Sequence, residues 1–216
     1  MYQRTPFVEQ DPDTLLGLMQ AYPLATLIRG GSELAADLLP LEVDHAQGSW
    51  RLRGHVARAN PLWREADGQP VLVVFQGPQA YISPNWYPSK AQHGKDVPTW
   101  DYTMVQAHGT LRAIDDKAWL RGFVERLTER HEGGRAKPWR VSDAPADYLD
   151  AMLKAIVGVE IEVTRIEGKF KLNQNYDAAD RTGAVLGLCA DAAEGRQPDA
   201  DAVARAMQAA EQRRKP

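Results

Sequence analysis

The chain has 216 residues, 44% of them hydrophobic, and its 26 basic and 29 acidic residues give a formal net charge of −3. A chain of this length buries about 70% of its unfolded surface, which suffices for one domain without disulfides or metals. The slightly acidic balance argues against a dedicated nucleic-acid-binding domain, which usually carries a strongly basic face.

Turn residues divide the first third of the chain into one helix and several short strands. Asp11 followed by Pro12 predicts the capped start of a helix, which Tyr22-Pro23 ends. Asn60 with Pro61 opens a helical turn, and Gly77-Pro78 predicts a turn between two strands. The strands expected here are 24–28, 33–43, 50–58, 71–75 and 80–83.

In the rest of the chain, strands and helices do not alternate regularly. A proline-rich loop is expected over 84–98, followed by a strand over 99–114, helices over 116–132 and 145–156, a strand around 159–163, and helices over 178–190 and 199–214. Strands that do not alternate with helices favour an α+β fold, a β-barrel of mainly antiparallel strands with flanking helices. We expect one domain over 1–190 and a C-terminal helical extension over 191–216 that packs on the same domain or on a partner subunit.

The ends and the cysteine content indicate where the protein works. Residues 1–6 contain no apolar signal segment, and no stretch approaches the roughly 18 apolar residues of a membrane span. The single cysteine, Cys189, cannot form an internal disulfide, and the apolar run around it predicts a buried structural thiol. We expect a cytoplasmic protein without membrane association.

Several enzyme classes lack their motifs in this chain. The histidines never pair at the spacing of a helical zinc site, and no phosphate loop, dinucleotide fingerprint or nucleophile elbow occurs. We therefore expect no metal ion. No residue demands a catalytic role, so enzymatic activity is left open.

A cationic cluster lies at the exit of the strand 50–58. Arg53 and His55 share one face of this strand, and Arg58 follows at its end. Asn60 caps the next helical turn, whose first N–H groups point to the same region. Guanidinium groups beside free helix-start donors suit a phosphate, while a solvated strand face with an ordinary cap explains the pattern equally well.

Two further clusters are rich in aromatic and amide groups. Ser83 precedes the proline-rich loop, and Trp86 and Tyr87 lie in its first part. Thr99, Trp100 and Tyr102 follow the loop. Their flat rings suit a planar heterocycle, although a loop packed on the barrel would also use them. Lys171, Gln174 and Asn175 suit a polyhydroxy chain or a carbonyl edge, or form a solvated turn. Together the three clusters supply the phosphate, ring and hydrogen-bond contacts of a mononucleotide-type cofactor.

Ordered motifs along residues 1–190 resemble those of a known family. They are Met1-Tyr2 with Pro6-Phe7, Pro23 to Leu27, Gly54 to Pro61, Phe75 to Pro78, Tyr81 to Pro84 with Trp86-Tyr87, Pro98 to Trp100 with Tyr102, and Lys171 with Gln174-Asn175. This set closely resembles the PaiB family, whose members are called FMN-binding negative transcriptional regulators. The resemblance implies a split β-barrel of the kind shared by FMN-binding flavin reductases and pyridoxamine-phosphate oxidases. It also implies a homodimer with FMN in the cleft between its subunits.

The resemblance assigns roles to individual residues. His55 and Arg58 stand where this barrel class grips the cofactor phosphate. The residues that begin the strand crossing to the partner's cofactor are Thr99, Trp100 and Tyr102. The residues of the family's C-terminal signature are Lys171, Gln174 and Asn175.

The chain also departs from the family pattern. Glutamines replace histidines at Gln79 and Gln106, Asn85 replaces a serine, Asp101 replaces an asparagine, and Tyr176 replaces a basic residue. Fewer basic groups beside a dianionic phosphate are expected to weaken FMN binding.

Three functions remain open on the sequence. The first is a flavin-binding protein with weak NAD(P)H-dependent reductase activity. The second is a transcriptional regulator, although the net charge and the absence of a helix-turn-helix signature argue against strong direct DNA binding and favour an indirect route through a protein partner. The third is a cofactor-free binding module that keeps the barrel without using flavin.

Overall fold

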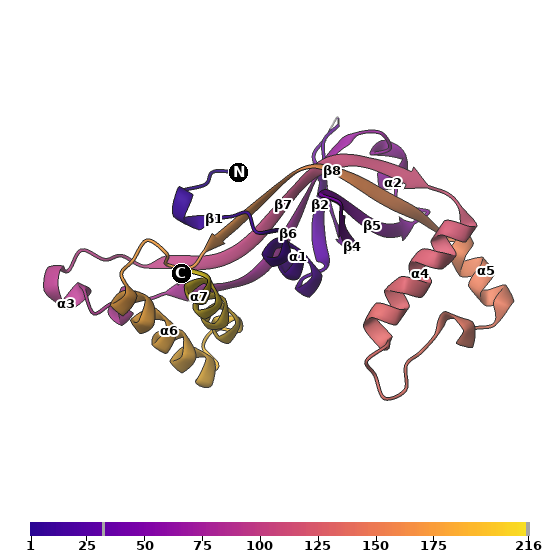
Figure 1. Cartoon of the computed structure of the whole chain (residues 1–216). Coiled ribbons are helices and arrows are strands. Elements are labelled where there is room, and N and C mark those ends of the chain that lie inside the picture. Colours follow the sequence, from indigo (N-terminus) through magenta and orange to yellow (C-terminus); the bar gives the residue numbers. More distant parts are fainter. Residues whose placement is uncertain (32, 215–216) are drawn as a thin grey trace. The chain divides into compact units, whose positions relative to one another are not determined.

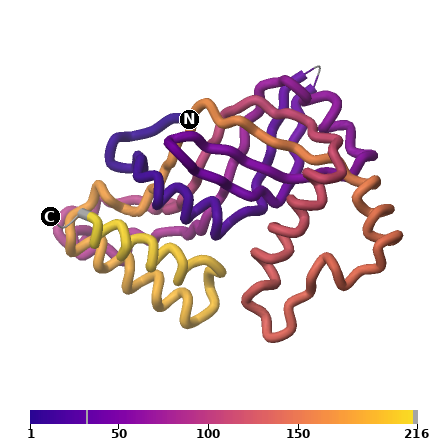
Figure 2. Tube along the Cα trace, turned by 45° about the vertical axis from the view of Figure 1, so that its right-hand side comes forward, coloured from indigo at the N-terminus to yellow at the C-terminus, as the bar shows by residue number. Residues whose placement is uncertain are grey.

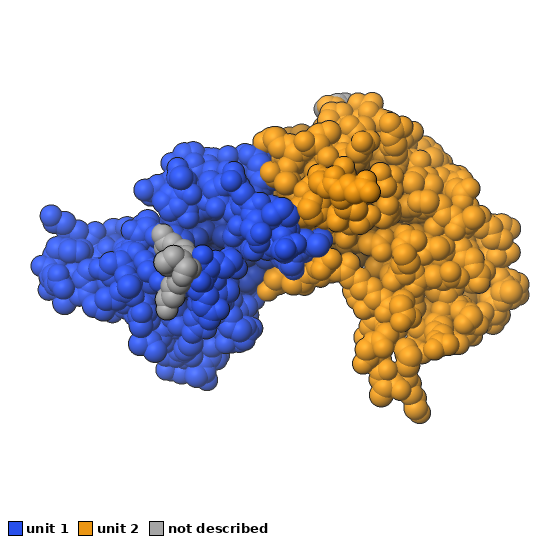
Figure 3. All heavy atoms as spheres, viewed as in Figure 1, with its two compact units in different colours: residues 1–18, 76–105, 167–216 blue, residues 19–75, 106–166 orange. Residues whose placement is uncertain are grey.

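The computed structural model describes residues 1–31 and 33–214. The chain forms two compact units (Figure 3), each built from separate stretches of sequence. Unit 1 contains residues 1–18, 76–105 and 167–216, and unit 2 contains residues 19–75 and 106–166. The expected boundary near residue 190 stays a prediction, and the helix that follows it lies in the same unit as the helix before it.

The order of elements is shown in Figure 1. The helices are α1 (Pro12–Ala21), α2 (Leu62–Glu65), α3 (Lys90–His93), α4 (Lys117–Glu132), α5 (Ala146–Lys154), α6 (Ala178–Ala193) and α7 (Ala200–Arg214), with single 3-10 turns η1 (Thr5–Phe7), η2 (Pro84–Trp86) and η3 (Val141–Asp143). The strands are β1 (Val8–Glu9), β2 (Leu24–Arg29), β3 (Ala35–Pro40), β4 (Glu42–Ala46), β5 (Ser49–Ala57), β6 (Pro70–Ile82), β7 (Thr99–Ile114) and β8 (Ile156–Lys171).

Hydrogen bonding connects the strands in the order β3-β2-β6-β7-β8-β5-β4, and β1 pairs with β8. Within unit 2, β5 pairs antiparallel with β8, in the register His55 to Gly158, and β2 pairs antiparallel with both β3 and β6. Within unit 1, β1 pairs antiparallel with β8. The three longest strands, β6, β7 and β8, each contribute residues to both units.

Unit 2 has a core on one face of its sheet. Leu52 and Val56 of β5 are buried, as the alternation in the sequence predicts, and so are Val159 and Ile161 of β8. The helix α4 begins where expected, because the Asp116 carboxylate accepts the Trp119 N–H at 2.6 Å. Beyond the sheet, α4, η3 and α5 enclose a separate apolar cluster that contains Leu120, Val141, Leu149 and Leu153.

Unit 1 is organised around the helices α6 and α7, which lie side by side in both views (Figure 1, Figure 2). The indole of Trp86 lies against Gly187 of α6, where an added Cβ would come within 2.2 Å of the ring. A Cβ on Gly183, one turn earlier, would come within 2.0 Å of the Trp86 carbonyl oxygen. The two glycines therefore form the seat into which η2 packs.

The turn predicted at Gly77-Pro78 is wrong, because β6 runs unbroken through it. Both residues are buried, and the alternation of buried and exposed positions changes phase there, as at a β-bulge. Gly77 is needed for close packing, since a Cβ would come within 2.3 Å of Thr103 Oγ1 and 2.5 Å of Leu18. Past this point the Tyr81 N–H donates to the side chain of Gln197 at 2.7 Å, so the linker between α6 and α7 covers the strand edge.

Most other expected elements are confirmed. The strand over 99–114 and the helices near 116–132, 178–190 and 199–214 match β7, α4, α6 and α7 within a few residues, and β8 is longer than expected. Cys189 is exposed on α6, so the expectation of a buried thiol is wrong. The buried face of α6 instead takes Ala184 and Leu188. Among the described residues, no helix combines the length and apolar character needed to cross a bilayer.

Candidate functional site

The expected site residues divide between the two units. Arg53, His55, Arg58 and Asn60 belong to unit 2, and the other nine belong to unit 1.

In unit 2 the guanidinium of Arg53 is held by carboxylates. Its Nε donates to Glu160 Oε2 at 2.9 Å, and its Nη1 lies 3.6 Å from Asp44 Oδ2. The Arg53 side chain is 17% exposed. Its charge is thus already compensated by two acidic side chains of neighbouring strands.

His55 is partly buried against α4. Its ring meets the ring of Phe123 edge-on at 5.7 Å between centroids, and its buried Nδ1 has no hydrogen-bond partner. Burial lowers the pKa of His55, which favours the neutral imidazole. A neutral ring offers an anion at most one N–H donor.

The guanidinium of Arg58 is held by a carboxylate and by backbone carbonyls. Its two terminal nitrogens donate to the two Asp115 carboxylate oxygens at 2.7 and 2.6 Å, and its Nε donates to the Lys154 carbonyl at 2.7 Å. Asn60 has a capping role, as predicted, because its Oδ1 accepts the Leu62 N–H at 2.8 Å. The phosphate contacts expected at His55 and Arg58 stay a prediction, and a phosphate at Arg58 would have to replace Asp115.

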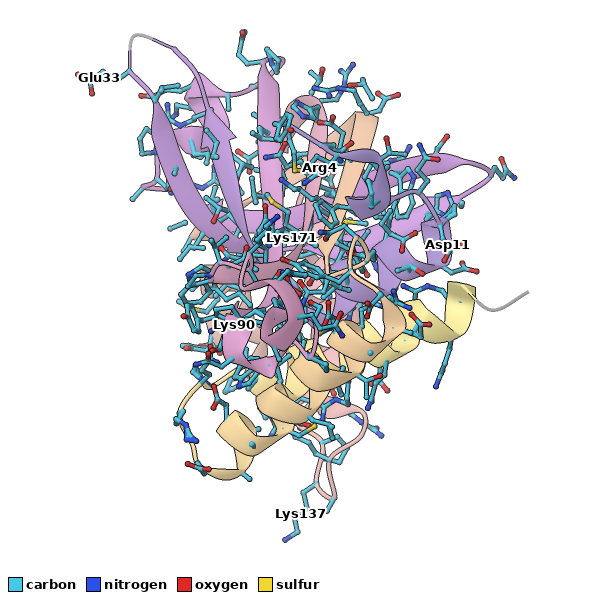
Figure 4. The ribbon with its side chains drawn as sticks, turned by 90° about the vertical axis from the view of Figure 1, so that its left-hand side faces the viewer. Arg4, Asp11, Glu33, Lys90, Lys137 and Lys171 are labelled. Carbon is cyan, nitrogen blue, oxygen red and sulfur yellow. The ribbon has the colours of Figure 1, made fainter. Side chains whose placement is uncertain are left out.

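In unit 1 the ammonium of Lys171 gathers three acceptors from the start of β7. It donates to Thr99 Oγ1 at 2.6 Å, to the Trp100 carbonyl, and to Asp101 Oδ1 at 3.2 Å. Lys171 is the last residue of β8 (Figure 4). The structure thus brings together Lys171 and Thr99, two residues that are 72 positions apart in the sequence.

Asp101, which the sequence marks only as a departure from the family, completes this cluster. Its side chain is 0% exposed, and burial raises its pKa from 3.8 to about 6, although the Lys171 charge and hydrogen bond act in the opposite direction. Its second oxygen, Oδ2, is buried and has no partner, and the same holds for Thr103 Oγ1 two residues along the strand.

Aromatic rings and a second lysine lie near this cluster on the more exposed face of the same strands. Trp100 is 54% exposed and meets Tyr81 of β6 edge-on at 6.2 Å between centroids. The Lys169 ammonium lies 5.5 Å from the ring centre of Tyr102 and 5.7 Å from that of Tyr2. We call this set, Tyr2, Tyr81, Trp100, Tyr102 and Lys169, the aromatic face of unit 1.

Residues 83–87, at the start of the proline-rich loop, pack within unit 1. Ser83 caps η2 by accepting the Asn85 N–H at 3.2 Å, and Trp86 lies on the glycines of α6. Tyr87 is buried, stacks on Tyr176 at 4.5 Å, and accepts a hydrogen bond from Asn173 at 3.0 Å. These contacts are the structural packing of the loop, which the sequence also allowed as an alternative to binding a planar heterocycle. A cofactor role for these residues stays a prediction.

The C-terminal signature forms a turn. The Gln174 carboxamide accepts the Leu172 N–H at 2.8 Å and donates to the Phe170 carbonyl at 2.5 Å, which closes the turn around Asn173, a residue with a left-handed φ of 60°. Asn175 is exposed. Gln174 therefore shapes the backbone that follows Lys171.

Sequence reasoning missed Tyr81 and Lys169 as candidate site residues. The signal for Lys169 was present, because it precedes Lys171 by two residues and so shares its face of the strand. Tyr81 was placed in the expected strand over 80–83 and in a family motif, but its contact with Trp100 depends on the pairing of strands distant in sequence. Among the described residues, no cluster of histidine, cysteine and carboxylate side chains has the geometry to hold a metal ion.

Known proteins resemble this chain in sequence. Residues 1–165 match the family described as "Putative FMN-binding domain". An uncharacterized protein of Aspergillus fumigatus is 36% identical over an alignment of 170 residues that covers 63% of this chain and 65% of that protein. The protease synthase and sporulation protein PAI 2 of Bacillus subtilis is 35% identical over 143 residues, 66% of each chain. The match thus spans slightly less than two thirds of the length of these relatives.

Solved structures resemble the fold. The FAD and heme binding protein from Mycobacterium smegmatis superposes with a TM-score of 0.57 at 19% identity, covering 82% of this chain and 79% of that one. The flavocytochrome Anf3 from Azotobacter vinelandii gives a TM-score of 0.56 at 14% identity, with coverages of 84% and 78%. With the antiparallel sheet and its flanking helices, this likeness confirms the predicted fold class, an α+β split β-barrel.

Proposed function

This chain belongs to the PaiB-type family of FMN-binding domains, and on that premise we propose that it binds FMN at the aromatic face and Lys171 of unit 1. The observation that carries the proposal is the combination of exposed rings with lysine ammonium groups. Flat rings suit an isoalloxazine, and ammonium groups suit the anionic parts of the nucleotide. These residues therefore fit the cofactor.

The chain's own residues would hold and orient the flavin. Trp100 and Tyr102 supply apolar faces, and Lys169 and Lys171 supply positive charge beside them. FMN, when bound, supplies two-electron redox chemistry. We propose weak NAD(P)H-dependent reduction of the bound flavin as the activity.

We further propose that the protein is a cytoplasmic homodimer whose subunits meet at the aromatic face. A monomer that leaves Trp100 54% exposed and Tyr2 78% exposed has large rings to bury, and the family resemblance implies a cofactor cleft between two subunits. Sedimentation of the purified protein is expected to give twice the chain mass. A monomer that still binds FMN would overturn the dimer and leave flavin binding intact.

The decisive experiment for flavin binding is an FMN titration followed by visible absorption and quenching of flavin fluorescence. Wild-type protein is expected to saturate at one FMN per chain, and Trp100→Ala to bind more weakly. Trp139→Ala is the matched control, because Trp139 is a comparably exposed indole of unit 2. Protein that stays colourless and does not perturb FMN would favour the cofactor-free binding module instead.

A regulatory role rests on the family resemblance. The net charge of −3 favours regulation through a protein partner over direct DNA binding. Sequence-specific retention of promoter DNA on a gel at moderate salt would establish the direct route. Loss of binding without sequence preference as salt rises would count against it.

A further inference from the structure

The hydrogen-bonding capacity of Lys171 is already used in full. An ammonium group has three N–H donors and no acceptor. The three acceptors around Lys171 Nζ are Thr99 Oγ1, the Trp100 carbonyl and Asp101 Oδ1. An anionic ligand therefore finds no vacant donor on Lys171 unless one of these three contacts is given up.

Asp101 is the acceptor that can release a donor by changing its charge. Thr99 and the Trp100 carbonyl do not titrate, whereas Asp101 is a carboxylate 3.2 Å from Lys171. The free oxygen Oδ2 is buried without a partner, so the carboxylate is poorly stabilised on that side. Thr103 Oγ1, also buried and unpartnered, lies on the same buried face of β7.

Few other titratable groups act on Asp101. Lys171 approaches from β8, Tyr87 follows η2, and Tyr176 lies in the turn after β8. Burial raises the pKa of both tyrosines, so both phenols stay neutral near pH 7. Among the described residues, Asp96 and Asp180 act on Tyr176, and only Lys171 shifts the pKa of Asp101 by its charge. The charge of the Asp101–Lys171 pair near neutral pH therefore depends on these two groups, and Asp101, whose pKa is raised by burial, is the one that changes.

We propose that Asp101 couples anion binding at Lys171 to the uptake of one proton. The anionic group of the ligand takes the N–H that Asp101 Oδ1 holds, and one Asp101 oxygen takes a proton from solvent. The pair then carries a net charge of +1 instead of zero and compensates the ligand. The identity of the ligand as FMN rests on the proposed function.

The proposal is tested by FMN affinity at pH 5 and pH 8 in wild-type protein and in Asp101→Asn. The asparagine has the shape of the neutral carboxyl and cannot ionise. Because a phosphate monoester itself titrates near pH 6, the quantity to compare is the ratio of the wild-type Kd to the D101N Kd at each pH. We expect this ratio to be about 1 at pH 5 and about 100 at pH 8, since pH 8 lies about two units above the pKa of Asp101 and each unit corresponds to about tenfold.

A matched control removes a carboxylate elsewhere in unit 1. Asp96→Asn makes the same change of charge, and Asp96 contacts Ser89 and His93, not Lys171. Its Kd ratio is expected to stay near 1 at both pH values. A ratio for D101N that is the same at pH 5 and pH 8, or one that D96N reproduces, would overturn the coupling.

A second measurement needs no variant. Calorimetric titration of wild-type protein with FMN at pH 7, in two buffers of different ionisation enthalpy, reports the protons taken up. The same titration with D101N gives the number of protons taken up by the phosphate. We expect wild type to take up close to one proton more than D101N. If wild type binds FMN without this excess proton, the coupling is overturned but FMN binding stands. If wild type and all variants fail to bind FMN at either pH, both the coupling and the proposed function are overturned.

Discussion

The cations of the two units meet different surroundings. In unit 2, Arg53 and Arg58 are each paired with exposed or half-buried carboxylates, and Arg58 also lies 6.0 Å from the ring centre of Trp63. In unit 1, Lys169 lies beside the rings of Tyr2 and Tyr102, and the carboxylate paired with Lys171 is fully buried. The ion pairs of Arg53 and Arg58 are therefore open to water, whereas the pair of Lys171 has a buried carboxylate and lies in the unit where Lys169 contacts aromatic rings.

A cationic motif in a sequence therefore does not by itself locate an anion site. Arg58 follows a strand and precedes a helical turn, as a phosphate-binding arginine would, yet Asp115 occupies both ends of its guanidinium fork. The following predictions test whether the ligand-binding charge indeed resides in unit 1.

The largest effect is expected from Lys171→Met. Removing the ammonium leaves the buried Asp101 without its charged partner, and breaking a buried pair in this way costs about 3–5 kcal/mol of unfolding free energy. The loss should be greatest at pH 8 and smaller at pH 5, where Asp101 takes up a proton. Urea unfolding at both pH values measures it, with Lys169→Met as the control on the same strand. An equal loss at the two pH values would contradict the role of Asp101.

The next largest effect is the pH dependence that Asp101 contributes to stability. Its pKa in the folded state, about 6, lies above the unfolded value of 3.8, so the folded protein binds more protons between these values and its stability falls as pH rises through them. The shift corresponds to about 3 kcal/mol. Asp101→Asn should lack this decrease. The difference in unfolding free energy between the variant and wild type should therefore rise in favour of the variant by about 3 kcal/mol between pH 4 and pH 7. Parallel stability curves for the two proteins would refute it.

A smaller effect is expected from Trp100→Ala. Loss of one ring face should weaken FMN binding about fivefold, which corresponds to about 1 kcal/mol of aromatic contact. The same truncation at Trp139, in unit 2, should leave the Kd unchanged. If the two variants lose affinity equally, the aromatic face of unit 1 is not the flavin site.

The smallest effect on FMN is expected from Arg58→Ala. Asp115 already satisfies the guanidinium, so we expect the Kd for FMN to change by less than about threefold, the scale of a screened surface contact. Riboflavin, which lacks the phosphate, serves as the comparison ligand. A large loss for FMN that riboflavin does not show would place the phosphate at Arg58, as the family resemblance implies.

The predictions of local structure that were confirmed depended on short-range signals. Asp116 and Asn60 cap their helices because a side chain two or three residues away from a free N–H reaches it without help from the rest of the fold. The prediction of a turn at Gly77-Pro78 was wrong because the glycine is required for close packing against Leu18 and Thr103, which are distant in sequence. Trp86 likewise packs on Gly187 of α6, 101 positions later in the sequence, which no local pattern reveals.

The family, the fold class and the alternation of β5 were all predictable from the amino-acid sequence, which also nominated Thr99, Trp100 and Lys171 as candidate site residues. Which charges are compensated became visible only in the folded chain, because ion pairs such as Arg58–Asp115 and Lys171–Asp101 join residues 57 and 70 positions apart. The folded chain also buries Asp101, and the free energy of a charge depends on that burial more than on the residue type.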